Sequence, residues 1–350
     1  MKDTIPSPKH LYSIIVPSFN RSDEIRELLT SFTALDFEPS RLELIIADDG
    51  SEDDTALLVK NFQEKLPFQL YFYSQTNQGP GAARNMGMQY AQGDFFIFID
   101  SDCTVPPFWL KNIDLALKQS QAEAFGGRDS FRPDFPDLLK AINYSMTSFI
   151  TTGGLRGRKG KKLAKFYPRS FNMGLSRNLY DKIGGFGSLR HGQDIEYSHR
   201  MIKSGAKIVF IDNAVVYHKR RTSLKKFFRQ VFNWGVARIN LYKIDPTMLE
   251  PLHAAPAAAT LFLFLLFTAS FFSQSLWYIT RILLFIGLGI LGFSGIHAAL
   301  KYRRFSMLIL VPIIMPIQIV GYGMGFISAF ISRIILGKSE FTGFRKKYYQ

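Results

Sequence analysis

The chain has 350 residues, 47% of them hydrophobic, and a formal net charge of +15 at pH 7. Positive charge of this size favours a negatively charged partner: nucleic acid, an anionic lipid or a phosphorylated substrate. The single cysteine, Cys103, excludes an internal disulfide and fits a reducing compartment. The N-terminus carries an acid and prolines before its first apolar run, so it lacks the pattern of a signal peptide.

Up to about residue 245, short apolar runs alternate with stretches of helical periodicity. The predicted strands are 12–19, 42–50, 68–74 and 94–100, and the predicted helices between them are 21–35, 53–66 and 82–92. This alternation predicts an α/β domain with a mostly parallel, doubly wound sheet. In such sheets ligands bind beyond the carboxyl ends of the strands.

Two acids follow the last of these strands. Residues 93–103 read GDFFIFIDSDC, in which one serine separates Asp100 from Asp102. Residues two apart in an extended chain point to the same side, so both carboxylates can converge on one point. Like charges that close favour a bound cation. A simple turn leading into a helix is the alternative explanation for the pair.

Beyond residue 253 the chain becomes much more apolar. Three long runs without Asp, Glu, Lys or Arg cover 254–272, 282–300 and 307–331, and the third contains Pro312 and Pro316. Each is about as long as a helix that crosses a bilayer. Helices buried in a soluble core are the alternative, but uncharged runs of this length are rare there.

Basic residues predict how these runs are oriented. Stretches rich in Lys and Arg lie at 218–230, before the first run, and at 301–304, after the second. By the positive-inside rule, we expect a multi-pass protein of the cell inner membrane with its N-terminal domain in the cytoplasm. The basic C-terminus, 344–350, conflicts with a third crossing. The run 307–331 therefore either spans the membrane, re-enters it or lies along its surface.

Four motifs occur in a fixed order along the N-terminal domain. They are VPSFNR (16–21), ADDGSEDDT (47–55), NQGPGAARNMG (77–87) leading to the DSD of 100–102, and GGFGSLRHGQDIEYSHRMIKSGAKI (184–208). Together they resemble the inverting family 2 glycosyltransferases, over about residues 11–240. The resemblance implies a Rossmann-like GT-A domain over 1–245. An α-helical membrane region with two to three hydrophobic helices and a basic tail is then expected over 246–350.

The resemblance also implies a donor site for a nucleotide sugar. Asp48 is expected to accept a hydrogen bond from the imide N–H of a uracil, and Arg84 to approach the diphosphate or to orient the aspartates. Asp100 and Asp102 are expected to hold Mn²⁺ or Mg²⁺, with His218 completing the metal shell. The full set of implied donor residues is Pro17, Phe19, Asn20, Asp48, Asp49, Arg84 and Asp100. The structural alternatives are that the aspartates form turns or cap helices, that Arg84 is an exposed helix residue and that His218 packs against its neighbours.

On the acceptor side, the resemblance makes Asp194 the general base that deprotonates the attacking hydroxyl. Gln193 departs from the family's Glu-Asp pattern, and Glu196 is either an acceptor-side residue or half of an i,i+4 pair with Arg200. Gln230 and Trp234 are further acceptor-side candidates. They belong to a sequence similar to the Q-x-x-R-W motif of processive synthases, but Asn233 replaces the arginine. This departure, with few membrane helices, argues against a polymer-extruding channel.

The basic segment 155–169 is expected to be a loop that meets a diphosphate or an anionic lipid, or simply a solvated loop. Nucleic acid is disfavoured as a partner, because the basic residues cluster beside the apolar runs and no nucleic-acid motif is evident. A nicotinamide-dependent oxidoreductase is also disfavoured. The dinucleotide-binding motif of such enzymes, G-x-G-x-x-G, would require a glycine at position 84, where this sequence has Arg84.

The resemblance thus implies a metal-dependent inverting glycosyltransferase. It would move a sugar from a nucleotide-sugar donor, with a UDP-sugar expected, to a lipid-linked or cell-envelope glycan acceptor at the cytoplasmic membrane face. Two alternatives stay open. One is a polyprenyl-phosphate sugar transferase, and the other is a non-catalytic membrane protein that binds nucleotide sugars.

Overall fold

The structure is a computed structural model of the whole chain and describes residues 10–130, 135–152, 166–218 and 223–344; of His218 only the backbone is described. The chain folds into two compact units. Unit 1 comprises Met1–Arg132, Phe166–Lys219 and Lys347–Gln350, and unit 2 comprises Pro133–Lys165 and Arg220–Lys346. Part of the sequence before residue 246 therefore packs with the apolar helices.

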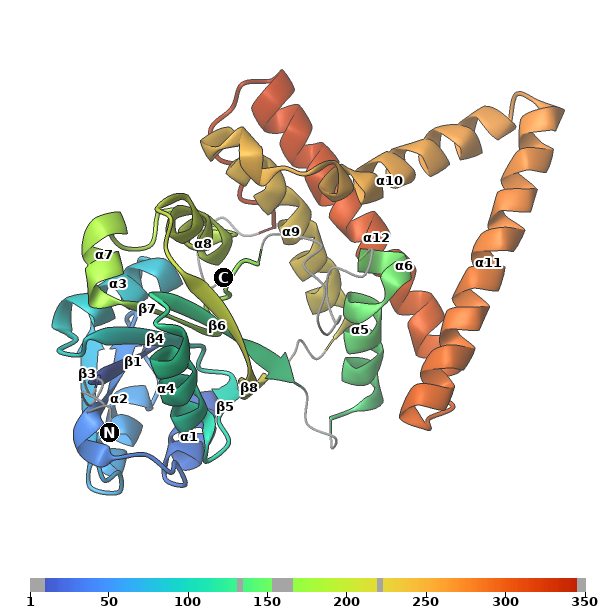
Figure 1. The fold of residues 1–350 in the computed structure, drawn as a ribbon. Helices are drawn as coiled ribbons and strands as arrows, with labels where there is room; N and C mark the ends of the chain where they lie inside the picture. The colour runs from blue at the N-terminus through green and yellow to red at the C-terminus, as the bar shows by residue number, and fades with distance from the viewer. Residues whose placement is uncertain (1–9, 131–134, 153–165, 219–222, 345–350) are drawn as a thin grey trace, which may run out of the picture. The chain divides into compact units, whose positions relative to one another are not determined.

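Unit 1 is built on one mixed sheet of eight strands in the order β3-β2-β1-β4-β7-β6-β8-β5 (Figure 1). The strands are β1 (Tyr12–Ser18), β2 (Leu42–Asp48), β3 (Gln69–Ser74), β4 (Phe95–Ile99), β5 (Cys103–Thr104), β6 (Ala124–Ser130), β7 (Asn172–Ser176) and β8 (Ile208–His218). Strands β3, β2, β1 and β4 are parallel, as predicted. Beyond β4 the sheet becomes mixed, because β7 pairs antiparallel with both β4 and β6.

Helices cover both faces of this sheet. They are α1 (Ser22–Phe32), α2 (Thr55–Gln63), α3 (Pro80–Tyr90), α4 (Trp109–Ser120), α7 (Arg177–Ile183) and α8 (Gln193–Lys203), with a short 3₁₀ turn η1 (Pro39–Arg41). Ile14 and Val16 of β1 pack toward α1, α2 and α4, whereas Ile15 packs toward α3, α7 and α8. Because side chains alternate along a strand, a strand covered on both faces is apolar throughout. This is why these strands were visible as continuous apolar runs.

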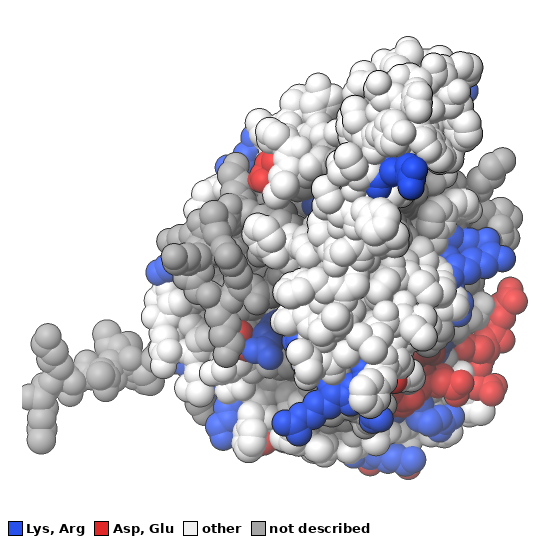
Figure 2. All heavy atoms as spheres, turned by 90° about the vertical axis from the view of Figure 1, so that its right-hand side faces the viewer, with Lys and Arg blue, Asp and Glu red and all other residues white. Residues whose placement is uncertain are grey.

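Unit 2 is entirely helical in its described residues. Its elements are α5 (Asp137–Thr147), α6 (Phe149–Thr152), α9 (Leu224–Ile244), η2 (Pro246–Met248), α10 (Pro251–Ser270), α11 (Gln274–Tyr302), α12 (Met307–Phe330) and the π-helical turn η3 (Ile331–Ile335). Three helices are long and apolar enough to cross a membrane: α10, α11, and α12 with η3. Figure 2, which faces α11, shows a broad surface over these helices that carries few charged side chains.

The three apolar helices differ in how much protein covers them. Only 6% of the apolar window is buried in α10 and 17% in α11, but 39% is buried in α12 with η3. Helix α12 packs along α9 and also contacts α5, α10 and α11. It runs without interruption through Pro312 and Pro316, so the prolines that suggested a broken segment lie inside one helix.

Candidate active site

The carboxyl end of β2 carries two buried acids. The Asp48 carboxylate accepts hydrogen bonds from the backbone N–H groups of Gly50 (3.1 Å) and Ser51 (2.8 Å) and from the hydroxyls of Ser51 and Ser74. Its side chain is 1% exposed. A hydrogen bond to a uracil would have to compete with these donors, so the direct contact of Asp48 with a nucleotide stays a prediction.

Asp49 ties the next loop to the same strand. Its carboxylate accepts hydrogen bonds from the Gln75 side chain (2.7 Å) and from the backbone N–H groups of Gln78 (2.9 Å) and Gly79 (2.7 Å). Gly79 has φ of 101°, a conformation that favours glycine, and α3 begins at the following residue, Pro80. Asp49 thereby fixes the entry to the helix that carries Arg84.

The first loop, after β1, is held beside the second. Asn20 adopts φ of 50°, its N–H donates to the Ser51 hydroxyl (2.8 Å), and its side-chain oxygen accepts from the N–H of Glu52 (2.8 Å). Pro17 is buried within β1, and Phe19 is half-buried. Asn20 thus lies next to the loop that follows Asp48, while Pro17 lies opposite Ala47 in the neighbouring strand.

Arg84 and the acid pair lie together at the end of β4. Arg84 Nη2 donates to Asp100 Oδ1 at 2.5 Å, and the guanidinium lies 5.4 Å from the ring centre of Phe186. Asp102 Oδ2 lies 3.9 Å from Arg21 Nη1. The Asp100 and Asp102 side chains are 30% and 20% exposed, while that of Arg84 is 6% exposed. Arg84 thus contacts one of the two aspartates, and its approach to a diphosphate stays a prediction.

This turn offers the oxygen ligands that a hard divalent cation prefers. Asp100, Ser101 and Asp102 connect β4 to β5, and β5 pairs with β8 so that Cys103 lies opposite His218. The side chain of His218 is outside the described residues. Among the side chains that are described, no three His, Cys, Asp or Glu form a metal site. The two carboxylates fit Mn²⁺ or Mg²⁺ as part of a shell to which substrate oxygens contribute, as is usual for Mg²⁺ sites that bind phosphates, and the part of His218 in that shell stays a prediction.

The predicted base, Asp194, begins α8 directly after Gly192, whose φ is 86°. Its carboxylate lies 2.6 Å from Arg169 Nε and is mostly buried, and the Ile195 N–H donates to Oδ1 at 2.9 Å. Sequence reasoning missed this role of Arg169, which is the last residue of the basic segment 155–169. Residues 155–165 of that segment lie outside the described part of the chain.

The other residues of this motif mainly organise the chain. Gln193 is buried and donates to the carbonyl of Gly187 (3.3 Å). A methyl group on Gly81 would lie 2.7 Å from the Gln193 amide, which places that amide at the start of α3. Glu196 pairs with Arg200 at 2.6 and 3.0 Å, the i,i+4 pair that was the alternative in the sequence.

The last two acceptor-side candidates belong to unit 2. Gln230 and Trp234 are on α9, where Trp234 packs against a core formed by α5, α9, α11 and α12. Their part in acceptor binding stays a prediction.

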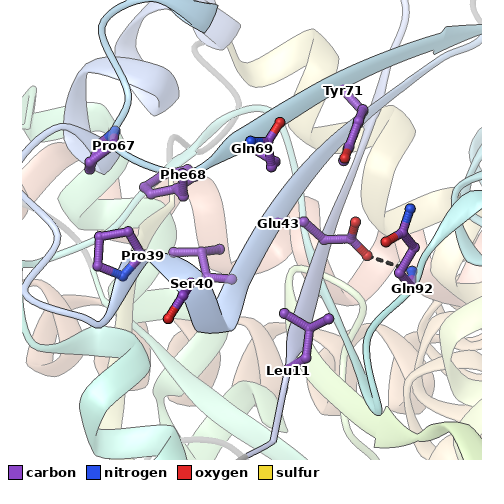
Figure 3. Close-up of a pocket in the computed structure, with 10 residues that line it drawn as sticks. Leu11, Pro39, Ser40, Glu43, Pro67, Phe68, Gln69, Tyr71 and Gln92 are labelled. Carbon is purple, nitrogen blue, oxygen red and sulfur yellow. Dashed lines mark hydrogen bonds between the residues drawn. The ribbon is translucent and has the colours of Figure 1, made fainter.

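A separate cavity of about 460 Å³ lies at the opposite end of the sheet (Figure 3). Leu11, Glu43 and Gln69, at or before the amino ends of β1, β2 and β3, contribute to its lining. Glu43 Oε1 accepts a hydrogen bond from the N–H of Gln92 at 2.6 Å. None of the site residues predicted from the sequence lines this cavity, so it is not the candidate active site.

Comparison with known proteins agrees with this geometry. Residues 13–184 match the family model described as glycosyl transferase family 2. The glycosyltransferase AglE of Haloferax volcanii is 25% identical over 252 residues, which cover 70% of this chain and 79% of that protein. A GalNAc(5)-diNAcBac-PP-undecaprenol beta-1,3-glucosyltransferase of Campylobacter jejuni is 35% identical over 115 residues, 33% of this chain and 37% of that protein.

A solved structure shows the same architecture. The mannosyltransferase PcManGT from Pyrobaculum calidifontis, solved with GDP-Man and Mn²⁺, superposes with a TM-score of 0.61 at 20% identity and covers 89% of this chain and 88% of that one. The sheet and its flanking helices therefore define a GT-A fold, followed by helices able to span a membrane. Residues 13–184 therefore form a family 2 glycosyltransferase domain, and the relatives and the fold support the assignment of the chain as an enzyme of this kind.

Proposed function

We propose that the chain is a metal-dependent, inverting glycosyltransferase. It takes a sugar from a nucleotide-sugar donor, expected to be a UDP-sugar, and passes it to a lipid-linked or cell-envelope glycan acceptor at the cytoplasmic membrane face. The observation that carries this proposal is the Asp100–Asp102 pair at the carboxyl end of β4, partly exposed and oriented by Arg84. Ligands of open α/β sheets bind at this end.

On the donor side, Asp100 and Asp102 would hold the divalent ion against the donor diphosphate. When bound, such an ion offsets the negative charge that develops on the departing nucleoside diphosphate. Arg84 fixes the orientation of Asp100, and Asp49 fixes the loop and the helix from which Arg84 projects. Both contacts form within the chain itself, so the cation site is prepared before the donor arrives.

On the acceptor side, the Asp194 carboxylate accepts the proton of the attacking hydroxyl. The hydroxyl oxygen bonds to the anomeric carbon as the bond from that carbon to the phosphate oxygen breaks, and the electron pair leaves with the diphosphate. The attack comes from the face opposite the leaving group, so the anomeric configuration inverts. Arg169, at 2.6 Å, holds the ionised carboxylate in place before the proton arrives.

The membrane helices and a relative support the proposed acceptor class. Apolar helices able to span a bilayer are part of the same chain as the sugar-transfer domain. The Campylobacter jejuni relative is named for an undecaprenol-linked glycan acceptor. A polyprenyl phosphate, on which the attacking oxygen belongs to a phosphate instead of a sugar hydroxyl, is the second candidate acceptor.

The test is a mass-spectrometric screen. Purified full-length protein in lipid nanodiscs, with Mn²⁺, is incubated with single nucleotide sugars and total membrane lipids. We expect one donor to yield nucleoside diphosphate together with a lipid whose mass rises by one glycosyl residue. A glycosylated polyprenyl monophosphate would favour the second acceptor. Absence of both transfer and donor hydrolysis with every common nucleotide sugar would favour a non-catalytic binding protein instead.

A further inference from the structure

The chain that follows α12 returns to α9. The Asn240 side-chain amide of α9 donates to the carbonyl of Phe341 at 2.9 Å, and its oxygen accepts from Arg333 at 2.8 Å. The ring centre of Phe344 lies 4.6 Å from that of Phe232. Asn240 is fully buried, so these contacts belong to the packed interior of unit 2. The end of α12 is thereby fixed beside α9.

The beginning of α12 is fixed beside α5. The Ser306 hydroxyl donates to the Asp137 carboxylate, at the first residue of α5. Asn143 of α5 donates to the hydroxyl of Tyr302 at 3.2 Å, at the end of α11. Both ends of α12 are therefore attached to helices that precede the apolar region in the sequence.

Neither α5 nor α9 can be separated from unit 1 by a bilayer. The link from β6 to α5 comprises residues 131–136, and the link from β8 to α9 comprises 219–223. At no more than about 3.6 Å per residue, each link is shorter than the roughly 30 Å of a hydrocarbon core. Helix α9 carries cationic side chains along its length, including Arg229 and Arg238, and does not qualify as a span.

Because both ends of α12 lie on the side of unit 1, the chain crosses the membrane an even number of times between α9 and the C-terminal segment. We propose that α10 and α11 cross as a hairpin, and that α12 lies along the membrane surface on the side of unit 1. Figure 1 shows α10 and α11 extending away from α9 and α5 and meeting at a turn. This assignment goes beyond the proposed function and does not depend on it.

Burial agrees with the assignment. Helices α10 and α11 are almost uncovered by protein, as lipid-surrounded helices are, whereas α12 is covered on one flank by α9 and α5. On that flank Gln318 of α12 accepts a hydrogen bond from Ser145 of α5 at 2.7 Å, and both side chains are buried. The exposed side chains of α12, which include Leu308, Ile309 and Ile313, are apolar, as contact with lipid requires.

The distribution of charge agrees as well. Lys301, Arg303 and Arg304 stand just before α12, and Arg333 and Lys338 stand at its end and beyond. Cations at both ends are expected if both ends face the anionic cytoplasmic leaflet. The basic tail then lies on the same side as the basic residues of α9, so its conflict with a third crossing disappears.

Cysteine labelling tests the proposal. Single cysteines are introduced into the full chain as Arg303→Cys, Lys338→Cys and Gln274→Cys, all at exposed positions, in a Cys103→Ser background. Native Cys103 is buried. The unaltered chain, which keeps this cysteine, serves as the unlabelled control. A membrane-impermeant maleimide is applied to right-side-out and to inside-out vesicles.

We expect positions 303 and 338 to label from one face and position 274 only from the other. Labelling of 338 from the face of 274 would show three crossings and overturn the proposal, and labelling of all three from one face would overturn the α10–α11 hairpin. Detergent-permeabilised vesicles verify that each cysteine can react.

Protection of a C-terminal epitope from protease is a second, independent measurement. We expect protease to remove the epitope in the same vesicle preparation in which the cysteine at position 303 is labelled. Survival of the epitope there would contradict the proposal. Neither reading requires catalysis.

Discussion

Asp194, the proposed proton acceptor, forms an ion pair with Arg169. The carboxylate lies at the first turn of α8, where the helix N-terminus favours negative charge, and Arg169 contacts it at 2.6 Å. The pair is mostly buried, so solvent screens it less than a surface pair. The two residues stand 25 positions apart (194 − 169) and meet only through the fold, so no local pattern in the sequence could have linked them.

Asp194→Asn should abolish base function without disturbing the donor site. The amide keeps the shape of the side chain but cannot take the hydroxyl proton, so we expect turnover to fall by about 10²- to 10⁴-fold. Donor affinity, measured by calorimetry with Mn²⁺, should stay unchanged. Asp181→Asn, at an exposed position of α7, is the matched control and should keep normal turnover. Near-normal turnover of Asp194→Asn would exclude this residue as the base.

Arg169→Gln should lower turnover while leaving the KM for the donor unchanged. The contact is a close ion pair without hydrogen-bond geometry, for which about 1 kcal/mol is a typical value, so the loss should be roughly 5-fold if all of it positions the carboxylate. Arg169→Lys should recover part of the rate, and guanidinium ion added to Arg169→Ala should do so as well. An unchanged turnover in Arg169→Gln would show that the ion pair has no part in positioning Asp194.

At the scale of elements, α9 and α12 approach each other through glycines. A methyl group on Gly325 would fall inside van der Waals contact with the Phe232 carbonyl, and one on Gly235 would do the same with that of Tyr322. By contrast, Gly289 of α11 has open space around it. The difference predicts opposite responses to the same substitution.

Gly325→Ala should destabilise unit 2 by about 1–3 kcal/mol, because the added methyl group overpacks a backbone contact. Gly289→Ala, the control, should leave stability unchanged or raise it by up to about 1 kcal/mol, since alanine favours a helix. Thermal unfolding of the full chain in detergent measures both. Equal midpoints for the two variants would contradict the close approach of α9 and α12.

The elements that sequence reasoning recognised are those with a strong local signal. Strands β1, β2 and β4 are buried on both faces and appear as continuous apolar runs, and Asp48 and Asp100 mark where two of them end. Strand β7 reads NMGLS, with a buried Asn172 and a glycine, so neither its existence nor its antiparallel direction has a local signature. Pro312 and Pro316 suggested a break, but tertiary packing along α9 sustains a continuous α12.

At the scale of the whole molecule, one chain joins a sugar-transfer domain to helices suited to a bilayer. The charge of +15 is concentrated near those helices, which suits a cytoplasmic face and an anionic substrate. The sequence predicted this combination because hydropathy and motif order are both local patterns. It could not predict that α12 returns to α9, since that depends on contacts such as Asn240 with Phe341.

The central claim is that the Asp100–Asp102 pair holds the cation against which the diphosphate leaves. The most direct measurement is the rate of sugar transfer by EDTA-treated full-length protein as Mn²⁺ is returned. We expect the unaltered chain to regain its rate in a saturable manner and Asp102→Asn to stay below about 1% of it, a loss of the size that removal of a transition-state charge contact causes. Asp36→Asn, on an exposed ion pair with Lys111, should behave like the unaltered chain. Full transfer without any divalent ion, or the same Mn²⁺ response in Asp102→Asn, would contradict the account.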